Sequence, residues 1–89
     1  MGKAEISWKT KSVEGLRREV YVACTGHEWR FFEREKRFDD WQRVEQPRLE
    51  DLLELLDGVQ RRVARRLMRP EDEQRVKRMI REAFPEAKI

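Results

Sequence analysis

Residues 49–68 read LEDLLELLDGVQRRVARRLM, the longest run of regularly spaced apolar side chains in the chain. These side chains recur at spacings of three and four residues, which is the period of one face of an α-helix. The residues on this face are Leu49, Leu52, Leu53, Leu56, Val59, Val63 and Leu67. Pro47 suits the first helical position because its missing N–H is not needed there. We therefore expect a helix over about residues 47–68.

Arginines fill the opposite side of this expected helix: Arg61, Arg62, Arg65, Arg66 and Arg69. They span an arc of about 140° at 100° per residue. One interpretation is a binding site for an anionic partner, such as the phosphates of a nucleic acid. The other is a solvated face, because bases suit the C-terminal end of a helix and Arg61 can pair with Asp57.

A second helix is expected over about residues 70–84. Pro70 can open it, and the three acids at 71–73 suit its first turn. Its apolar face has helical spacing and consists of Val76, Met79, Ile80, Ala83 and Phe84. Ion pairs are expected four residues apart, from Glu71 to Arg75 and from Glu73 to Lys77. With so short a linker, the two helices form either a tight hairpin or a corner.

The first half of the chain, about residues 4–45, alternates apolar and polar side chains as strands do. Strands are expected near residues 4–10, 17–24 and 27–35, and residues 41–45 are either a fourth strand or irregular. Thr25 and Gly26 suit a two-residue hairpin turn. That turn sets the cross-strand pairs Cys24 with His27, Val22 with Trp29, Val20 with Phe31, and Arg18 with Glu33.

The two sides of the expected sheet differ in character. One side collects Val20, Val22, Trp29 and Phe31, while the other is mixed and includes Tyr21 and Phe32. Tyr21 and Phe32 are either covered by another element or form a protein interface. Aromatic residues interleaved with bases can also hold single-stranded RNA on a sheet. The valine partners of the aromatic residues on the first side favour a core there.

The sequence thus predicts an α+β fold in a single domain over residues 1–89. It consists of an antiparallel sheet of three strands, or four if residues 41–45 pair, followed by two helices packed on one face. The expected core consists of Val20, Val22, Trp29, Phe31, Leu52, Leu56, Val59, Val63, Leu67, Val76, Ile80 and Phe84.

Composition narrows the class of protein. The chain is 44% charged, but 21 bases against 18 acids give a net charge of only +3. Strong non-specific nucleic-acid binders usually carry a larger excess of positive charge. A single cysteine, Cys24, excludes an internal disulfide and suits a reducing compartment. No apolar run resembles a signal peptide or a membrane span. We expect a cytoplasmic protein without a membrane partner.

Residues that could carry chemistry are few. Cys24 and His27 could form half of a zinc site, but the sequence has no second pair of ligands. Asp39 and Asp40 are adjacent, so in an extended chain they point to opposite sides. With one histidine and no glycine-rich phosphate loop, we expect no enzyme activity, no cofactor, no metal and no small-molecule substrate.

Two functions from different classes remain open. The first is a non-enzymatic protein-interaction or regulatory module, either with another protein or as a homodimer, using the edge strand at residues 4–10 or the side with Tyr21 and Phe32. The second is a nucleic-acid-binding module that uses the arginines of the first helix. The weak net charge favours the first, and a steep dependence on salt would favour the second.

Overall fold

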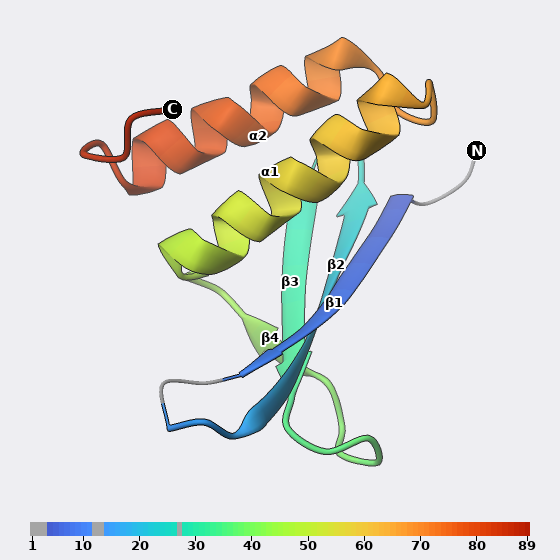
Figure 1. Ribbon diagram of the computed structural model, residues 1–89, viewed down its shortest axis with the longest axis vertical. Helices are drawn as coiled ribbons and strands as arrows, with labels where there is room; N and C mark the ends of the chain where they lie inside the picture. The colour runs from blue at the N-terminus through green and yellow to red at the C-terminus, as the bar shows by residue number, and fades with distance from the viewer. Residues whose placement is uncertain (1–3, 12–13, 27) are drawn as a thin grey trace. The chain divides into compact units, whose positions relative to one another are not determined.

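A computed structural model describes residues 4–11, 14–26 and 28–89. Four strands precede two helices along the chain, which confirms the α+β class and the fourth strand (Figure 1). The elements are β1 (Ala4–Lys11), β2 (Arg17–Thr25), β3 (Glu28–Arg34), β4 (Gln42–Val44), α1 (Leu49–Ala64) and α2 (Pro70–Ala83). They form two compact units, Met1–Gln46 and Pro47–Ile89. A single domain over the whole chain stays a prediction.

The sheet is an antiparallel meander in which every strand pairs with its neighbour in sequence, in the order β1-β2-β3-β4. β1 and β4 are therefore its edges. Gly15 has a φ of 81°, in the left-handed region, within the β1–β2 connection. That conformation is accessible to glycine at little cost, as expected for a turn residue.

The pairing of β2 with β3 differs from the expected register by two residues. Thr25 lies opposite Glu28 and Cys24 lies opposite Trp29, so Gly26 is the first residue of the turn and not the second. Its φ of 56° suits that position in a tight hairpin. The expected partner of Cys24, His27, lies outside the described residues. A two-residue shift leaves every side chain on its expected side of the sheet.

One side of the sheet, here called the Val20 face, carries the buried apolar side chains of the first unit. Ile6, Val20, Val22 and Phe31 are all less than 5% exposed. Trp29 was expected in this core but is only half-buried, because it lies one residue beyond Glu28 at the hairpin end of β3.

Arg18 is also buried on the Val20 face. Its Nε donates a hydrogen bond to Oε1 of Glu33 over 2.7 Å. The expected ion pair therefore exists, but it runs diagonally, since Glu33 lies opposite Val20.

Helix α1 is shorter than expected at both ends. It begins at Leu49 with Arg48 as its N-cap, so Pro47 is not its first residue. At its other end Arg66 has a φ of 61°. The N–H groups of Arg66 and Leu67 bond back to the carbonyls of Val63 and Arg62, over 3.0 and 2.8 Å. This is the Schellman pattern that ends helices, usually with glycine at the left-handed position.

The buried side of α1 is rotated by about 90° from the expected one. It consists of Asp51, Leu52, Leu55, Leu56, Gly58 and Val59. Leu55, which was not expected in the core, is fully buried, whereas Leu53 is 40% exposed. The spacing of apolar residues did not predict this side of the helix. Gly58 has no side chain, and Arg62, which lies one turn beyond Val59, is charged. Val63 is half-buried, and Leu67 is 70% exposed because it lies beyond the helix end.

Helix α2 returns alongside α1, so the two form a helical hairpin and not a corner (Figure 1). Pro70 is its first residue, as expected, and Val76 and Ile80 are fully buried. Phe84 was expected in the core, but it caps the helix and is half-buried.

Ion pairs support both helices. The expected Asp57–Arg61 and Glu73–Lys77 pairs are present at 3.0 and 3.2 Å, while Arg75 pairs with Asp72 in place of Glu71. The Asp72 carboxylate also accepts a hydrogen bond from the Arg69 backbone at the start of α2. Such pairs each stabilise an exposed helix by a few tenths of a kcal/mol, about 0.2–0.5.

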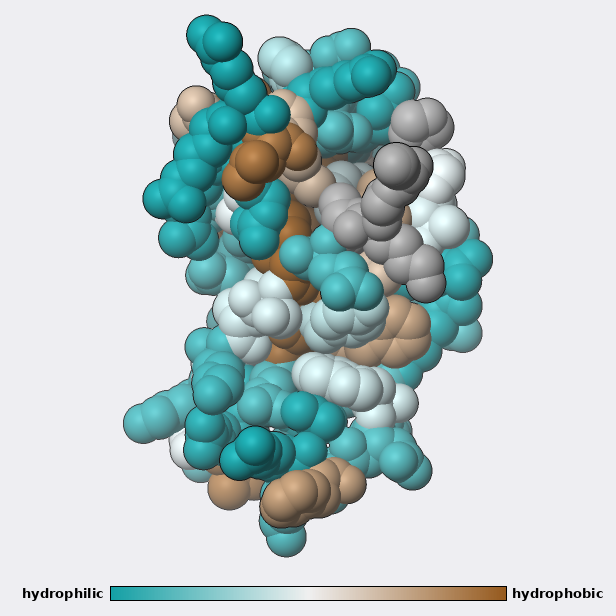
Figure 2. All heavy atoms as spheres, turned by 90° about the vertical axis from the view of Figure 1, so that its right-hand side faces the viewer, coloured by the Kyte–Doolittle hydropathy of each residue, from teal (hydrophilic) through white to brown (hydrophobic). Residues whose placement is uncertain are grey.

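Hydrophilic side chains predominate on the face of the molecule in Figure 2, and hydrophobic atoms appear only in patches between them. This agrees with a chain in which 44% of residues are charged. Across the described residues, neither helix is long and apolar enough to cross a membrane.

Candidate interaction surfaces

The second side of the sheet, here called the Tyr21 face, presents aromatic and charged side chains in cross-strand rows. One row runs from Ser7 through Tyr21 and Phe32 to Arg43, and the next runs from Lys9 through Glu19 to Arg34. The two predicted interface residues, Tyr21 and Phe32, are therefore directly opposite each other on adjacent strands.

Three aromatic rings meet on this face, and they are called the aromatic cluster below. The centroid of the Tyr21 ring lies 5.6 Å from that of Phe32 and 5.6 Å from that of Trp41, in both cases tilted by 40°. These separations are in the range at which aromatic pairs attract each other. Tyr21 and Phe32 are half-buried, and Trp41 is 39% exposed.

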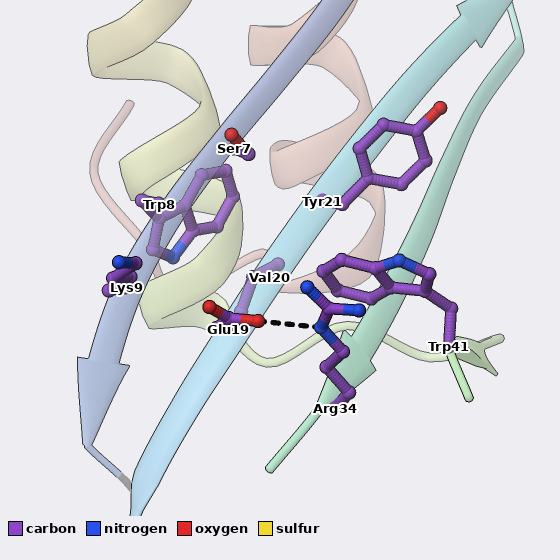
Figure 3. A pocket seen from close by; sticks show the side chains of 8 residues that line it. All are labelled: Ser7, Trp8, Lys9, Glu19, Val20, Tyr21, Arg34 and Trp41. Carbon is purple, nitrogen blue, oxygen red and sulfur yellow. Dashed lines mark hydrogen bonds and ion pairs between the residues drawn. The ribbon is translucent and has the colours of Figure 1, made fainter. Parts of the chain in front are cut away.

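Arg34 joins the aromatic cluster to a carboxylate. Its guanidinium lies over the Trp41 ring, 4.2 Å from the centroid, which is a cation–π geometry. Its Nε donates a hydrogen bond of 2.6 Å to Oε1 of Glu19, drawn as the dashed line in Figure 3. This hydrogen bond is the main reason why the pKa of Glu19 is lowered from 4.5. Arg34 is therefore held from two directions.

Tyr21 is also tied to an acid. Its hydroxyl donates a hydrogen bond of 2.8 Å to Oε1 of Glu5 on the neighbouring strand. This bond raises the pKa of the Tyr21 phenol above 10.0, because ionisation would replace the donor with a second negative charge. The polar end of the ring is thus occupied, and the ring itself lies beside those of Phe32 and Trp41.

A hollow of about 420 Å³ lies beside the aromatic cluster. Side chains of the Tyr21 face line it, as do Trp8 and Val20 from strand positions of the other face (Figure 3): Ser7, Trp8, Lys9, Glu19, Val20, Tyr21, Arg34 and Trp41. The hollow has an aromatic wall at Tyr21 and Trp41 and a charged wall at Lys9, Glu19 and Arg34. It can receive an apolar group that carries a polar end.

Bases outnumber acids on the Tyr21 face, but the acids are placed among them. The bases are Lys9, Lys11, Arg17, Arg30, Arg34 and Arg43, and the acids are Glu5, Glu19 and Glu28. Arg30 pairs with Glu28 at 2.8 Å, and Arg34 pairs with Glu19. The positive charge that remains is therefore concentrated at Lys9, Lys11, Arg17 and Arg43.

The five predicted arginines do not form a face of one helix. Arg61 and Arg62 belong to α1, Arg65 is its C-cap, Arg66 follows in the left-handed conformation, and Arg69 caps α2. Arg61 pairs with Asp57, and Arg62 donates to the Gly58 carbonyl over 3.2 Å. Arg65, Arg66 and Arg69 are exposed in the connection between the helices.

Two members of the site on the Tyr21 face were not expected from the sequence. Trp41 precedes β4 and reaches Tyr21 from the β3–β4 connection, so no strand period identifies it. Arg34 lies within the strand expected at residues 27–35, but it was not predicted as a site residue. Alternation along β3 does place it on the same side as Phe32, and that signal could have found it.

Across the described residues, no cluster of three or more histidine, cysteine or acidic side chains is arranged to hold a metal ion. Cys24 is half-buried in β2. Comparison of the chain with protein-family models, curated proteins and solved structures finds no match.

Proposed function

We propose that this protein is a non-enzymatic interaction module that binds a protein segment through the Tyr21 face of its sheet. The observation that carries the proposal is the aromatic cluster of Tyr21, Phe32 and Trp41, set on an open strand surface. Aromatic side chains with one polar end are enriched at the centres of protein interfaces, because they bury much area at little cost in conformational entropy.

The charge pattern favours a protein over a nucleic acid at this face. Phosphate binding requires bases whose charge is not neutralised, and it gains from the release of counterions. Here the carboxylate of Glu19 lies between Lys9 and Arg34 in its cross-strand row, and Glu28 neutralises Arg30. A phosphate chain crossing the sheet would meet these acids, whereas a folded or extended protein segment can place individual groups between them.

The aromatic cluster and the charges around it also indicate the chemistry of the partner. Its centre is an aliphatic or aromatic side chain that packs against Tyr21, Phe32 and Trp41. Its flanks are acidic, because the excess positive charge of this face lies at Lys9, Lys11, Arg17 and Arg43. Each such exposed charge pair adds little affinity but favours the correct orientation and speeds association.

A display selection with random peptides tests this proposal and defines the chemistry of the partner. The peptides are selected on the wild-type protein and then depleted on the Phe32→Ala variant. We expect peptides with one large apolar residue flanked by Asp or Glu. Fluorescence anisotropy should show that Phe32→Ala and Trp41→Ala each weaken their binding at least about tenfold, as loss of a central apolar anchor does. Arg65→Ala, in the connection between the two helices, is the matched control and should leave the affinity unchanged.

The proposal fails if no selected peptide distinguishes the wild type from Phe32→Ala while circular dichroism shows both to be folded. Equal losses with Phe32→Ala and Arg65→Ala would also contradict it, since that result would place the binding surface elsewhere.

Nucleic-acid binding is the second candidate, and one observation favours it. Arg65, Arg66 and Arg69 are exposed within a five-residue connection, and the sequence from 59 to 69 contains no acid. Anisotropy of labelled oligonucleotides at two salt concentrations tests it. Binding that weakens steeply with salt and is lost in the Arg65→Glu/Arg69→Glu variant, but kept in Phe32→Ala, would support this function in place of the first.

A further inference from the structure

The two edges of the sheet differ in how well they are protected from pairing with another strand. β4 has three residues, whereas β1 has eight and pairs with β2 without interruption from Ala4 to Lys11. β1 contains no proline. A long, regular edge strand is a ready template for a further strand, and proteins commonly shorten, bulge or interrupt such edges.

The sequence of β1 is complementary to itself in the antiparallel direction. If two copies pair about a two-fold axis at Ser7, Glu5 of each copy lies opposite Lys9 of the other, on the Tyr21 face. On the Val20 face, Ile6 of each copy lies opposite Trp8 of the other. We propose that the protein forms a homodimer through this pairing of two β1 strands.

The charged pairs on the Tyr21 face and the apolar pairs on the Val20 face support the same register independently. Opposite charges and aliphatic–aromatic contacts directly across an antiparallel ladder each stabilise it by about 0.2–1 kcal/mol. The symmetry gives every pair twice. Trp8 is only half-buried in the single chain and would gain a neighbour, while Glu5 and Lys9 are exposed. A one-residue shift would reverse the faces of one strand, so it is disfavoured.

One alternative that keeps the faces is a two-residue shift that places the two-fold axis at Trp8. Glu5 would then lie opposite Lys11, but Ile6 would lie opposite Thr10 and Lys9 opposite Ser7. The apolar pairs would be replaced by mixed ones, and Lys9 would no longer face an acid of the other copy. Of these two axes, only the one at Ser7 satisfies both faces.

Lysines on an edge strand often prevent pairing because they repel a second copy. Here the position of Lys9 relative to Glu5 has the opposite effect in the proposed register, since Lys9 of each copy meets Glu5 of the other. The same lysine opposes a parallel pairing in register, in which Lys9 would lie beside Lys9 of the other copy. The charge pattern therefore selects one arrangement and disfavours disordered association.

The dimer has a consequence for the proposed function, although it does not depend on it. Directly opposite residues on antiparallel strands point to the same side. The four strands of each copy would form one continuous sheet with both Tyr21 faces on one side. A partner with two binding segments, or two partners side by side, could then occupy both faces.

Light scattering coupled to size exclusion, over a wide concentration range, tests the dimer with the full chain. We expect a concentration-dependent dimer. Lys9→Glu and Glu5→Lys should each raise the dimer dissociation constant about tenfold, because two attractive pairs become repulsive. The double variant Glu5→Lys/Lys9→Glu restores opposite charges and should recover the wild-type dissociation constant. Lys11→Glu is the matched control on the same strand: Lys11 lies opposite no residue of β1 in this register, so its replacement should not raise the dissociation constant.

A crosslinking experiment tests the axis without altering either charge. In a background with Cys24→Ala, Ser7→Cys places two thiols directly opposite each other. The Cα atoms of such residues lie about 4.5–5.5 Å apart, which a disulfide can bridge. We expect rapid formation of a covalent dimer under mild oxidation, and slow formation with the control Lys11→Cys.

A strict monomer across the concentration range, or equal crosslinking of Ser7→Cys and Lys11→Cys, would overturn the inference. Sensitivity to Lys11→Glu together with tolerance of Lys9→Glu would overturn the proposed register. These outcomes are separate from the peptide selection, since Phe32→Ala should remain dimeric whether or not the Tyr21 face binds a partner.

Discussion

The two faces of the sheet use neighbouring residues of the same strand for different purposes. Phe31 and Phe32 are adjacent in β3, but Phe31 is 2% exposed on the Val20 face while Phe32 is half-buried on the Tyr21 face. Valines and an isoleucine accompany the first, and Tyr21 and cations accompany the second. The comparison shows that aromatic residues alone do not identify a core. Phe31 is buried because its neighbours are aliphatic, whereas Phe32 stays accessible because its neighbours are polar or charged.

The largest expected effect comes from exchanging the two phenylalanines for alanine one at a time. Phe31→Ala should lower the free energy of unfolding by about 3–5 kcal/mol, because it leaves a cavity among buried residues. Phe32→Ala should lower it by only about 1 kcal/mol. Chemical denaturation followed by circular dichroism measures both. Similar losses for the two variants would show that the faces are equally buried, which would contradict the comparison.

A substitution at Arg66, outside the sheet, should change the stability of the protein without changing peptide binding to the Tyr21 face. Arg66 adopts a left-handed conformation that costs a non-glycine residue roughly 1 kcal/mol. Arg66→Gly should therefore raise the free energy of unfolding by about 1 kcal/mol. Peptide binding to the Tyr21 face should not change. A loss of stability would mean that the Arg66 side chain contributes more than its backbone costs.

The ion pair of the Tyr21 face should produce a smaller, pH-dependent effect. The pKa of Glu19 is lower in the folded chain than its usual 4.5, mainly because of Arg34. The pair therefore stabilises the folded state fully above pH 4.5, and this contribution is lost as the pH falls through the lowered pKa. In Glu19→Gln, thermal stability should fall less between neutral and acidic pH than in the wild type. If both proteins lost thermal stability equally as the pH falls, the Glu19–Arg34 pair would not be the cause.

The smallest expected effect is the ionisation of Tyr21 at alkaline pH. The pKa of Tyr21 is raised above 10.0, mainly because its hydroxyl donates to Glu5. The protonated phenol thus stabilises the folded state below pH 10.0, and this contribution is lost as the pH rises through the raised pKa. Absorbance of the phenolate gives the titration directly, since Tyr21 is the only tyrosine. Glu5→Gln should move the midpoint back toward 10.0, and no movement would exclude Glu5 as the cause.

The assignment of side chains to the two faces of the sheet was predictable from the periodicity of the sequence. Alternation placed Tyr21 and Phe32 on one side and Val20, Val22 and Phe31 on the other, and these assignments are confirmed although the hairpin register was wrong. A face assignment survives an error of two residues because side chains alternate with a period of two. The register itself depends on which position Gly26 takes in the turn, and the sequence permits more than one.

The helix ends and the site composition were less predictable. A left-handed arginine ends α1 where a glycine is usual, so the expected arginine surface extended past the true helix. Arg65, Arg66 and Arg69 consequently lie in a connection and at caps, not on one helical face. Trp41 enters the aromatic cluster through a contact distant in sequence, to which local patterns are insensitive.

The order of the strands also bears on how the chain forms its structure. Every strand pairs with its neighbour in sequence, and the two helices pair with each other. Only short loops must close before these contacts form, and the entropy cost of closing a loop is smaller when the loop is short. All four strands have been synthesised by Val44, so on the ribosome we expect the meander to begin pairing while the helices are still being translated.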